Sequence, residues 1–271
     1  MNDNLAIKCG LIACFDILGY KEVLKHNDVR TVLNLLDTSI GEAIKEAENF
    51  GENCKDGSRE RTTAQRLSND FDYLVFSDTA IIACPFASNP SRVDAENLTF
   101  LVHFSSCFLA KMFVRGLPLR GAIHLGEYFV GNVPNIRDRV CAGAGIIAAY
   151  EDANRHDWSG CVFSSEAAEE VQILIERSDG YADHLKKILL RYPAPLKQGE
   201  QSRLVINYLF PFFPLPENKV CMPISEIRAE VLKQFSDNGK MIDEKCKSKL
   251  LNTEIFLTFC RAKHEEHLPA K

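Results

Sequence analysis

The sequence predicts an α+β protein with a ferredoxin-like β-α-β-β-α-β core, to which further strands and C-terminal helices are added. Three patterns predict this fold. Residues 9–16 (CGLIACFD) form a nearly unbroken apolar run, typical of a central strand buried on both faces. Residues 71–84 hold two short β-rich runs on either side of Ser77-Asp78, which indicates a hairpin. Helical and strand-like segments then alternate as far as residue 210.

The remaining elements follow from the hydrophobic period of each segment. After Gly19 the apolar residues from Val23 to Ile44 recur on one helical face, and the polar stretch 49–70 is expected to be a loop. LPLRGAIHLGEYFVG (117–131) predicts two strands with a turn around Gly126-Glu127. We expect helices at 94–114, 142–154 and 165–177, strands at 160–164 and 203–210, a Pro-rich stretch at Pro211, Pro214 and Pro216, and two helices within about 223–262.

Composition narrows the class of protein. The chain is 46% hydrophobic and 25% charged, as in ordinary soluble proteins, and its net charge of −5 predicts no nucleic-acid surface. None of the ten cysteines forms a CxxC pair, so we expect reduced thiols. No run approaches transmembrane length, and the expected location is cytoplasmic with no membrane partner. We expect residues 1–215 to form the catalytic domain and residues 216–271 to form a helical extension packed on it.

Two aspartates are the strongest candidates for chemistry. In a β-α-β-β-α-β unit the first strand lies antiparallel to the third, so Asp16, which closes the first, meets Asp78, which opens the third. A turn or N-cap role is the alternative for either aspartate alone. Paired carboxylates suit Mg²⁺ or Mn²⁺, and two such ions can activate an attacking oxygen and stabilise a leaving one. The pair therefore predicts a metal-dependent enzyme acting on nucleotide phosphates.

The segment after Asp16 is the candidate phosphate-binding element. Ile17, Leu18, Gly19 and Tyr20 lead into a predicted helix, so that backbone amides at its start are expected to cradle a triphosphate. Gly19 would allow a close approach of the backbone to the ligand.

Arginines near this segment are candidates for contacting phosphate oxygens, because a guanidinium suits such oxygens. Arg120, which precedes the predicted strand 121–125, is the preferred one, and a solvated strand-end charge is the alternative. His124 lies in an apolar run and is expected to be a hydrogen-bonded core histidine. The other arginines that flank the predicted site are Arg115, Arg137 and Arg139.

Five segments in order resemble the motifs of class III nucleotidyl cyclases. FDILGYKEVL resembles their first metal-binding motif and FSDTAII their second. LRGAIHLGEYFVGNV (119–133), CAGAGIIAAYEDA (141–153) and APLKQGEQSRLVINYLF (194–210) resemble the later ones. The resemblance covers roughly residues 9–210. It implies a cyclase fold, two Mn²⁺ or Mg²⁺ ions bound at Asp16, Ile17 and Asp78, a nucleoside triphosphate substrate, and a homodimer with shared active sites.

Departures from these motifs bear on the substrate. Asp72 stands where purine cyclases carry an adenine-selecting lysine. The family's base-contacting acid falls on Arg139 or Val140, its transition-state Asn on Ile146 or Ile147, and its transition-state Arg on Tyr150 or Glu151. Arg120, Arg139 and Tyr150 are therefore candidates to replace the missing catalytic groups.

The combination of a matching metal site and altered base contacts looks most like the bacterial pyrimidine cyclases of the Pycsar antiphage systems, which make cyclic CMP or cyclic UMP. That resemblance implies conversion of CTP or UTP as a signal in antiviral defence. A purine cyclase with unusual base contacts and a nucleotide-binding homologue without turnover are the alternatives.

Overall fold

The structure, a computed structural model, describes residues 6–53, 71–86, 92–133, 137, 139–176, 182–209 and 224–266. Its elements follow one another as β1 (Lys8–Ile17), α1 (Tyr20–His26), α2 (Val29–Asn53), β2 (Asp72–Phe76), β3 (Thr79–Pro85), α4 (Arg92–Val114), β4 (Leu119–Asn132), β5 (Arg139–Ala142), α5 (Ala144–Arg155), β6 (Gly160–Phe163), α6 (Ser165–Glu176), α7 (Ala182–Ile188), β7 (Leu189–Pro195), β8 (Glu200–Ile206), α8 (Ile224–Ser236) and α9 (Glu244–Glu266).

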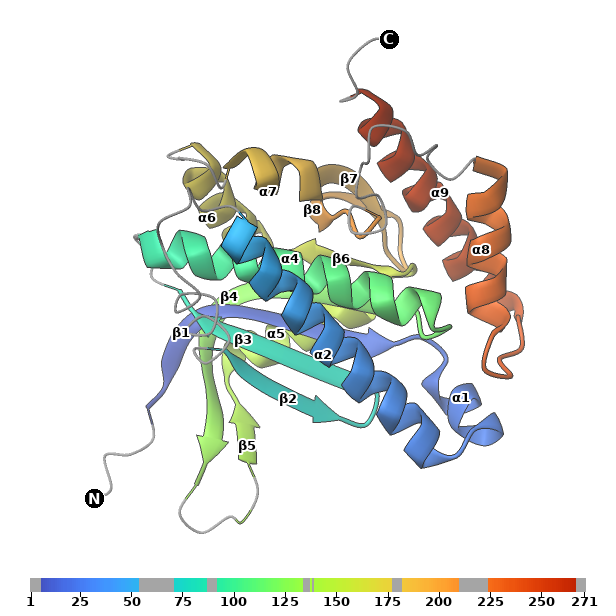
Figure 1. Ribbon diagram of the computed structural model, residues 1–271, viewed down its shortest axis with the longest axis horizontal. Helices are drawn as coiled ribbons and strands as arrows, with labels where there is room; N and C mark the ends of the chain where they lie inside the picture. Colours follow the sequence, from blue (N-terminus) through green and yellow to red (C-terminus); the bar gives the residue numbers. More distant parts are fainter. Residues whose placement is uncertain are drawn as a thin grey trace.

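One eight-stranded sheet organises the fold, with strand order β2-β3-β1-β4-β6-β8-β7 and β5 paired to β4 (Figure 1). Strands β2, β3, β1 and β4 are antiparallel neighbours, which is the strand order of a ferredoxin-like core. Strand β6 runs parallel to β4, and β8 and β7 extend the sheet beyond it. The predicted α+β class is confirmed, including the hairpin around Ser77-Asp78.

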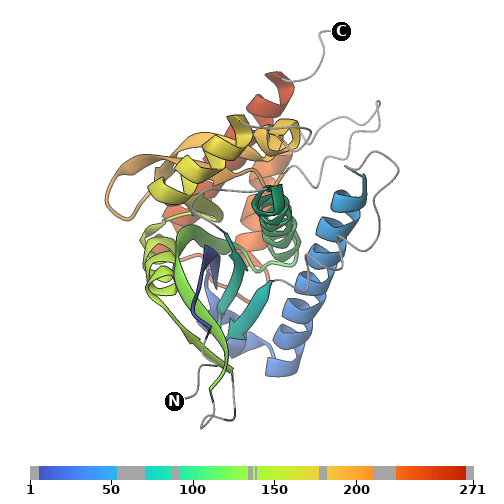
Figure 2. The same ribbon diagram turned by 90° about the vertical axis from the view of Figure 1, so that its left-hand side faces the viewer.

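Both faces of the sheet are covered, because α2 and α4 lie on one side and α5 on the other (Figures 1 and 2). Successive residues of a strand point to opposite faces. Leu11, Ala13 and Phe15 of β1 therefore enter the main core, whereas Ile12 and Cys14 enter a smaller apolar cluster beneath α5. This two-sided burial explains the unbroken apolar run in β1.

Strand β4 corrects one prediction, since residues 119–132 form a single strand without a turn at Gly126-Glu127. The glycine serves a different purpose. A Cβ on Gly126 would lie 2.9 Å from the Cα of Gly145, near the start of α5. Gly126 thus allows helix α5 to approach the strand closely, a packing requirement that resembles a turn signal in the sequence.

Other predicted boundaries also shift. The helix expected after Gly19 is divided into α1 and α2, and α2 continues to Asn53, so the predicted loop 49–70 begins too early; residues 54–70 lie outside the described ranges. The strand expected at 203–210 is β8, Glu200–Ile206. Strands β5 and β7 and helix α7 were not predicted. The Pro-rich residues 211–216 lie outside the described part of the chain.

Helix α4 corrects the expectation that no run approaches transmembrane length. Its segment Ala95–Val114 is long and apolar enough to cross a membrane by length and composition alone. In the fold, 89% of that stretch is buried, as expected of a core helix. Phe104 and Phe108 of α4 are fully buried, and the ring of Phe108 lies 5.5 Å from that of Phe15 in β1.

The C-terminal helices pack on the same core. The ring centroid of Phe256 in α9 lies 4.2 Å from that of Trp158, 5.0 Å from that of Tyr192 and 5.8 Å from that of Tyr208. Thr253 Oγ1 accepts a hydrogen bond of 2.9 Å from the backbone amide of Ser159. The expected boundary between residues 215 and 216 lies outside the described residues, but these contacts join α9 to the sheet.

Candidate metal and phosphate site

Asp16 and Asp78 meet at the end of β1. Asp16 pairs in register with Thr79, the first residue of β3, and the amide of Ile17 donates a 2.9 Å hydrogen bond to the carbonyl of Asp78. The two carboxylates are close enough for the charge of Asp78 to raise the pKa of Asp16. The structure therefore brings together the two aspartates that the topology predicted to meet.

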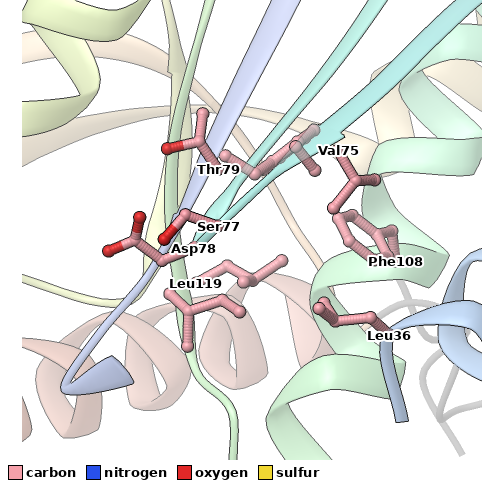
Figure 3. Close-up of a pocket in the computed structure, with 10 residues that line it drawn as sticks. Leu36, Val75, Ser77, Asp78, Thr79, Phe108 and Leu119 are labelled. Atoms are coloured by element: carbon pink, nitrogen blue, oxygen red, sulfur yellow. The ribbon is translucent and has the colours of Figure 1, made fainter. Parts of the chain in front are cut away.

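The hairpin between β2 and β3 directs Asp78. Ser77 adopts a left-handed backbone with φ 56°, which tightens the turn before Asp78. A shallow pocket lies beside the turn, with Leu36 and Phe108 among its apolar walls. The carboxylate of Asp78 points away from these two side chains (Figure 3). Ser77, Asp78 and Thr79 of the hairpin line the same pocket, so the polar turn borders these apolar walls.

Arg120 forms an ion pair with Asp16. These residues are cross-strand partners on β4 and β1, and Nε and Nη2 of Arg120 lie 2.8 Å and 2.7 Å from Oδ2 of Asp16. Asp16 is only 8% exposed, and its burial raises its pKa above the ordinary value; Arg120 opposes this shift and Asp78 adds to it. The buried carboxylate needs a cation, and Arg120 supplies that charge in this structure.

Asn154 and Lys197 belong to this site although the sequence analysis missed them. Nη2 of Arg120 donates to Oδ1 of Asn154, near the end of α5. Lys197, in the turn between β7 and β8, lowers the pKa of Asp16, while burial and then Arg120 lower the pKa of Lys197 itself. The sequence pattern does not predict β7, so it gives no position for the turn that carries Lys197. Nothing in the sequence pattern marked Asn154.

The predicted phosphate cradle is only partly available. The amide of Ile17 donates a hydrogen bond to the carbonyl of Asp78, and that of Leu18 donates a 2.9 Å hydrogen bond to the carbonyl of Pro118. These two amides therefore have backbone partners, and phosphate binding by Ile17 and Leu18 stays a prediction. Gly19 is the left-handed N-cap of α1, with φ 78°, and α1 has only seven residues. Gly19 and Tyr20 remain as candidates for backbone contact with a phosphate.

The carbonyl of Ile17 is the third candidate oxygen donor for a cation. In an extended residue the N–H and C=O groups point to the same side of the strand, so the carbonyl of Ile17 faces the hairpin strand that carries Asp78. Two carboxylates and this carbonyl form a set of oxygen donors, which suits Mg²⁺ or Mn²⁺. Within the described ranges, no three or more His, Cys, Asp and Glu side chains gather into a metal-binding group. The site therefore fits cations that take a few protein ligands and complete their shell with water and substrate phosphates.

Arg139 lies away from this edge. It pairs with Asn132 at the opposite end of β4 from Arg120. Its guanidinium donates to the carbonyl of Tyr73 at 3.1 Å and to Asp72 at 3.4 Å. Arg139 is therefore not brought to Asp16 or Asp78 of its own chain.

Tyr150 lies on helix α5, one turn before Asn154. Its side chain is 47% exposed on α5, and its carbonyl accepts a 3.0 Å hydrogen bond from Asn154, the partner of Arg120. Arg115 pairs with Glu42 at 2.8 Å, and Arg137 is exposed.

A second polar network holds α5 against the sheet. Asp152 of α5 lies 3.0 Å from Nε2 of His124 on β4 and accepts a hydrogen bond from Arg203 on β8. Burial raises the pKa of Asp152, but the hydrogen bond from His124, the nearby ring of His156 at 3.6 Å and the charge of Arg203 outweigh burial and hold that pKa well below its usual range. His124 is thus a hydrogen-bonded structural residue, as the sequence predicted.

No established protein family and no curated protein matches the chain. Among solved structures, it is similar to the guanylyl cyclase Cya2 with TM-score 0.42 and 12% identity over 74% of this chain and 92% of that one. It is similar to a bacterial light-regulated adenylyl cyclase with TM-score 0.44 and 10% identity, over 75% of this chain and 92% of that one. It is also similar to the adenylyl cyclase CyaB from P. aeruginosa, with TM-score 0.40 and 14% identity over 75% of this chain and 97% of that one. The fold assignment itself rests on the strand order and register.

Proposed function

We propose that this protein is a metal-dependent nucleotidyl cyclase. The observation that carries the proposal is the meeting of Asp16 and Asp78 at the end of β1, with the Ile17 carbonyl facing the same hairpin. The order of the cyclase-like motifs along residues 9–210 supports it. A buried carboxylate whose pKa is raised by burial is costly to keep ionised, which favours a functional role over a purely structural one.

The chain's own residues divide the work as follows. The carboxylates of Asp16 and Asp78 and the carbonyl of Ile17 would hold two divalent cations. When bound, these cations would supply positive charge to the phosphates and to the ribose 3′-hydroxyl. Arg120, which pairs with Asp16, and Lys197, whose charge lowers the pKa of Asp16, would contact phosphate oxygens, and the amides of Gly19 and Tyr20 would add hydrogen bonds. The 3′-hydroxyl would pass its proton to water, and its oxygen would attack the α-phosphorus in line as the bond between that phosphorus and the bridging oxygen breaks and pyrophosphate leaves.

More specifically, we propose a pyrimidine cyclase that converts CTP or UTP to cyclic CMP or cyclic UMP as a signal in bacterial antiphage defence. Asp72, at the position of the adenine-selecting lysine, pairs with Lys8 at 2.7 Å and with Arg139 at 3.4 Å. Its side chain is therefore engaged in holding strands together, and it offers no cation to a purine. This engagement supports a base pocket different from that of adenylyl cyclases.

We further propose a cytoplasmic homodimer with shared sites. Arg139 is held at Asp72, away from Asp16 and Asp78 of its own chain, and Tyr150 exposes its side chain on α5. Both residues would serve a site completed by a second copy. In that arrangement Asp16 and Asp78 of one subunit face the α5 side of the other.

A panel of four nucleoside triphosphates tests the proposal. Purified protein is incubated with Mn²⁺ and each of CTP, UTP, ATP and GTP, and the products are identified by chromatography and mass. We expect a cyclic pyrimidine nucleotide and pyrophosphate. Cyclic AMP or cyclic GMP alone would contradict the pyrimidine proposal and keep the cyclase one, and nucleotide binding without turnover would contradict both.

A further inference from the structure

The loop between α8 and α9, residues 237–243, contacts the segment that follows Asp16. Gly19 starts α1 with a left-handed backbone, and a Cβ on it would lie 3.2 Å from Cδ and 3.8 Å from Cγ of Lys240. The aliphatic stem of Lys240 therefore packs on the open side of Gly19. This contact joins the C-terminal helices to the proposed phosphate-binding backbone.

The amino group of Lys240 fixes this contact from behind. Lys240 is 9% exposed, and its Nζ donates to the carbonyls of Gln234 at 2.8 Å and Gly116 at 2.5 Å. Gly116 lies two residues before Pro118, whose carbonyl accepts the amide of Leu18 at 2.9 Å. One buried side chain thus links α8, the turn before β4 and the backbone at Gly19.

The same loop also holds the other end of α1. Nδ2 of Asn238 donates hydrogen bonds to the backbone carbonyls of Arg115 at 2.9 Å and Gly116 at 3.2 Å. The backbone carbonyl of Asn238 accepts a 3.0 Å hydrogen bond from Nδ2 of Asn27. Gly239 packs on His26, where a Cβ would lie 2.6 Å from the Cβ of His26. Both ends of α1 are therefore supported by residues 238–240.

We propose that Lys240 is a positioning residue for substrate: it holds Gly19 and Tyr20 where their amides meet the triphosphate. The inference rests on the proposed function. A seven-residue helix is too short to be stable alone, so its position is set by tertiary contacts. Small displacements of a binding group weaken the interactions that depend on its geometry. Lys240 makes no contact with phosphate itself, because its Nζ is engaged by two carbonyls.

Lys240→Met tests the proposal, because Met keeps an apolar stem and removes the donor. Met241→Ala, at the neighbouring residue that is 75% exposed, is the matched control. We expect Lys240→Met to raise the KM for the preferred triphosphate on the order of tenfold with little change in kcat. We also expect faster hydrogen exchange of the amides of residues 19–23. The control should match the wild type in both measurements.

A second measurement uses only the wild type, in case Lys240→Met does not fold. Coupling between two sites is reciprocal, so triphosphate with Mn²⁺ should slow hydrogen exchange in residues 237–243 as well as in 19–23. If the wild type binds triphosphate while exchange in 237–243 does not change, the inference is wrong; an unchanged KM in a folded Lys240→Met also overturns it. A wild type that binds no triphosphate would overturn the proposed function and this inference with it.

Discussion

Arg120 and Asp16 are direct cross-strand partners, and Nη2 of Arg120 lies 2.7 Å from Oδ2 of Asp16. The guanidinium therefore occupies part of the coordination space of a carboxylate proposed to bind a cation. A bound cation and Arg120 would compete for the same oxygen. The same guanidinium, once released, is well placed for phosphate oxygens.

Replacing Arg120 should separate metal binding from turnover. Arg120→Gln removes the competing charge, so we expect Mn²⁺ to bind several-fold more tightly at pH 8 without nucleotide. Turnover should fall by roughly two orders of magnitude or more, because a phosphate contact is lost in the transition state. Electron paramagnetic resonance of free Mn²⁺ measures the first effect, and a product assay measures the second.

Arg191→Gln on β7 is the control, since Arg191 is exposed and is not part of the proposed site. Arg191→Gln should change neither the Mn²⁺ affinity nor the turnover. Unchanged Mn²⁺ affinity in Arg120→Gln would show that the ion pair does not oppose metal binding.

Asp16→Asn should leave the protein as stable as the wild type, or more stable, at pH 7. Burial raises the pKa of Asp16 in the folded state, so the folded state binds the proton more tightly than the unfolded chain does. Stability contributed by this group therefore falls as pH rises from the unfolded value of about 3.9 through the raised folded value. Thermal unfolding at pH 7 checks this, and a large loss of stability would identify Asp16 as a structural residue.

Asp152 should behave in the opposite way. Asp152→Asn leaves Arg203, itself 8% exposed, without its anionic partner, and breaking a buried pair in this way costs about 3–5 kcal/mol. Urea unfolding measures the loss. Glu151→Gln, on the exposed neighbouring residue of α5, is the control and should have little effect on stability. Equal stabilities of the two variants would contradict a supporting role for the network.

The acid dependence of stability follows from the same network. The folded-state pKa of Asp152 is depressed, so its contribution is fully present above the unfolded value of about 3.9 and is lost as pH falls below it. Wild-type stability should therefore decline more steeply between about pH 4 and pH 2 than that of Asp152→Asn. Parallel curves for the two proteins would show that Asp152 does not carry this dependence.

Mixed dimers test whether the site is shared. Asp78→Asn, and the double variant Arg139→Ala with Tyr150→Ala, should each be inactive alone. In a mixed dimer one site would carry both defects and the other none, so activity should partly return. If the heterodimer forms and activity does not return, the site lies within one chain.

Part of the fold was predictable because its signals are local. The apolar run of β1 and the hairpin at Ser77-Asp78 have patterns that tertiary structure did not override. Strand β7 was missed because Pro193 and Pro195 argue against a strand, yet β7 lies at the edge of the sheet, where proline is tolerated. Gly126 indicated a turn because the close approach of α5 cannot be seen in the sequence.

The site was predictable only where topology determines it. Strand order alone brings Asp16 to Asp78, and the sequence pattern predicted that order. The ion pair of Arg120 with Asp16 depends on the register of β1 against β4, and the place of Asn154 depends on the rotation of α5. Register and rotation are set by packing, and no short-range pattern encodes them.

The most direct test compares wild type, Asp16→Asn and Asp78→Asn in one assay with Mn²⁺ and the preferred triphosphate, following cyclic nucleotide and pyrophosphate together. We predict that the wild type forms both in equal amounts. Each folded variant should lose activity by about three orders of magnitude or more, because each removes a carboxylate that holds the cations. A folded Asp78→Asn that retains near-normal cyclisation would contradict the assignment of these aspartates as the catalytic centre.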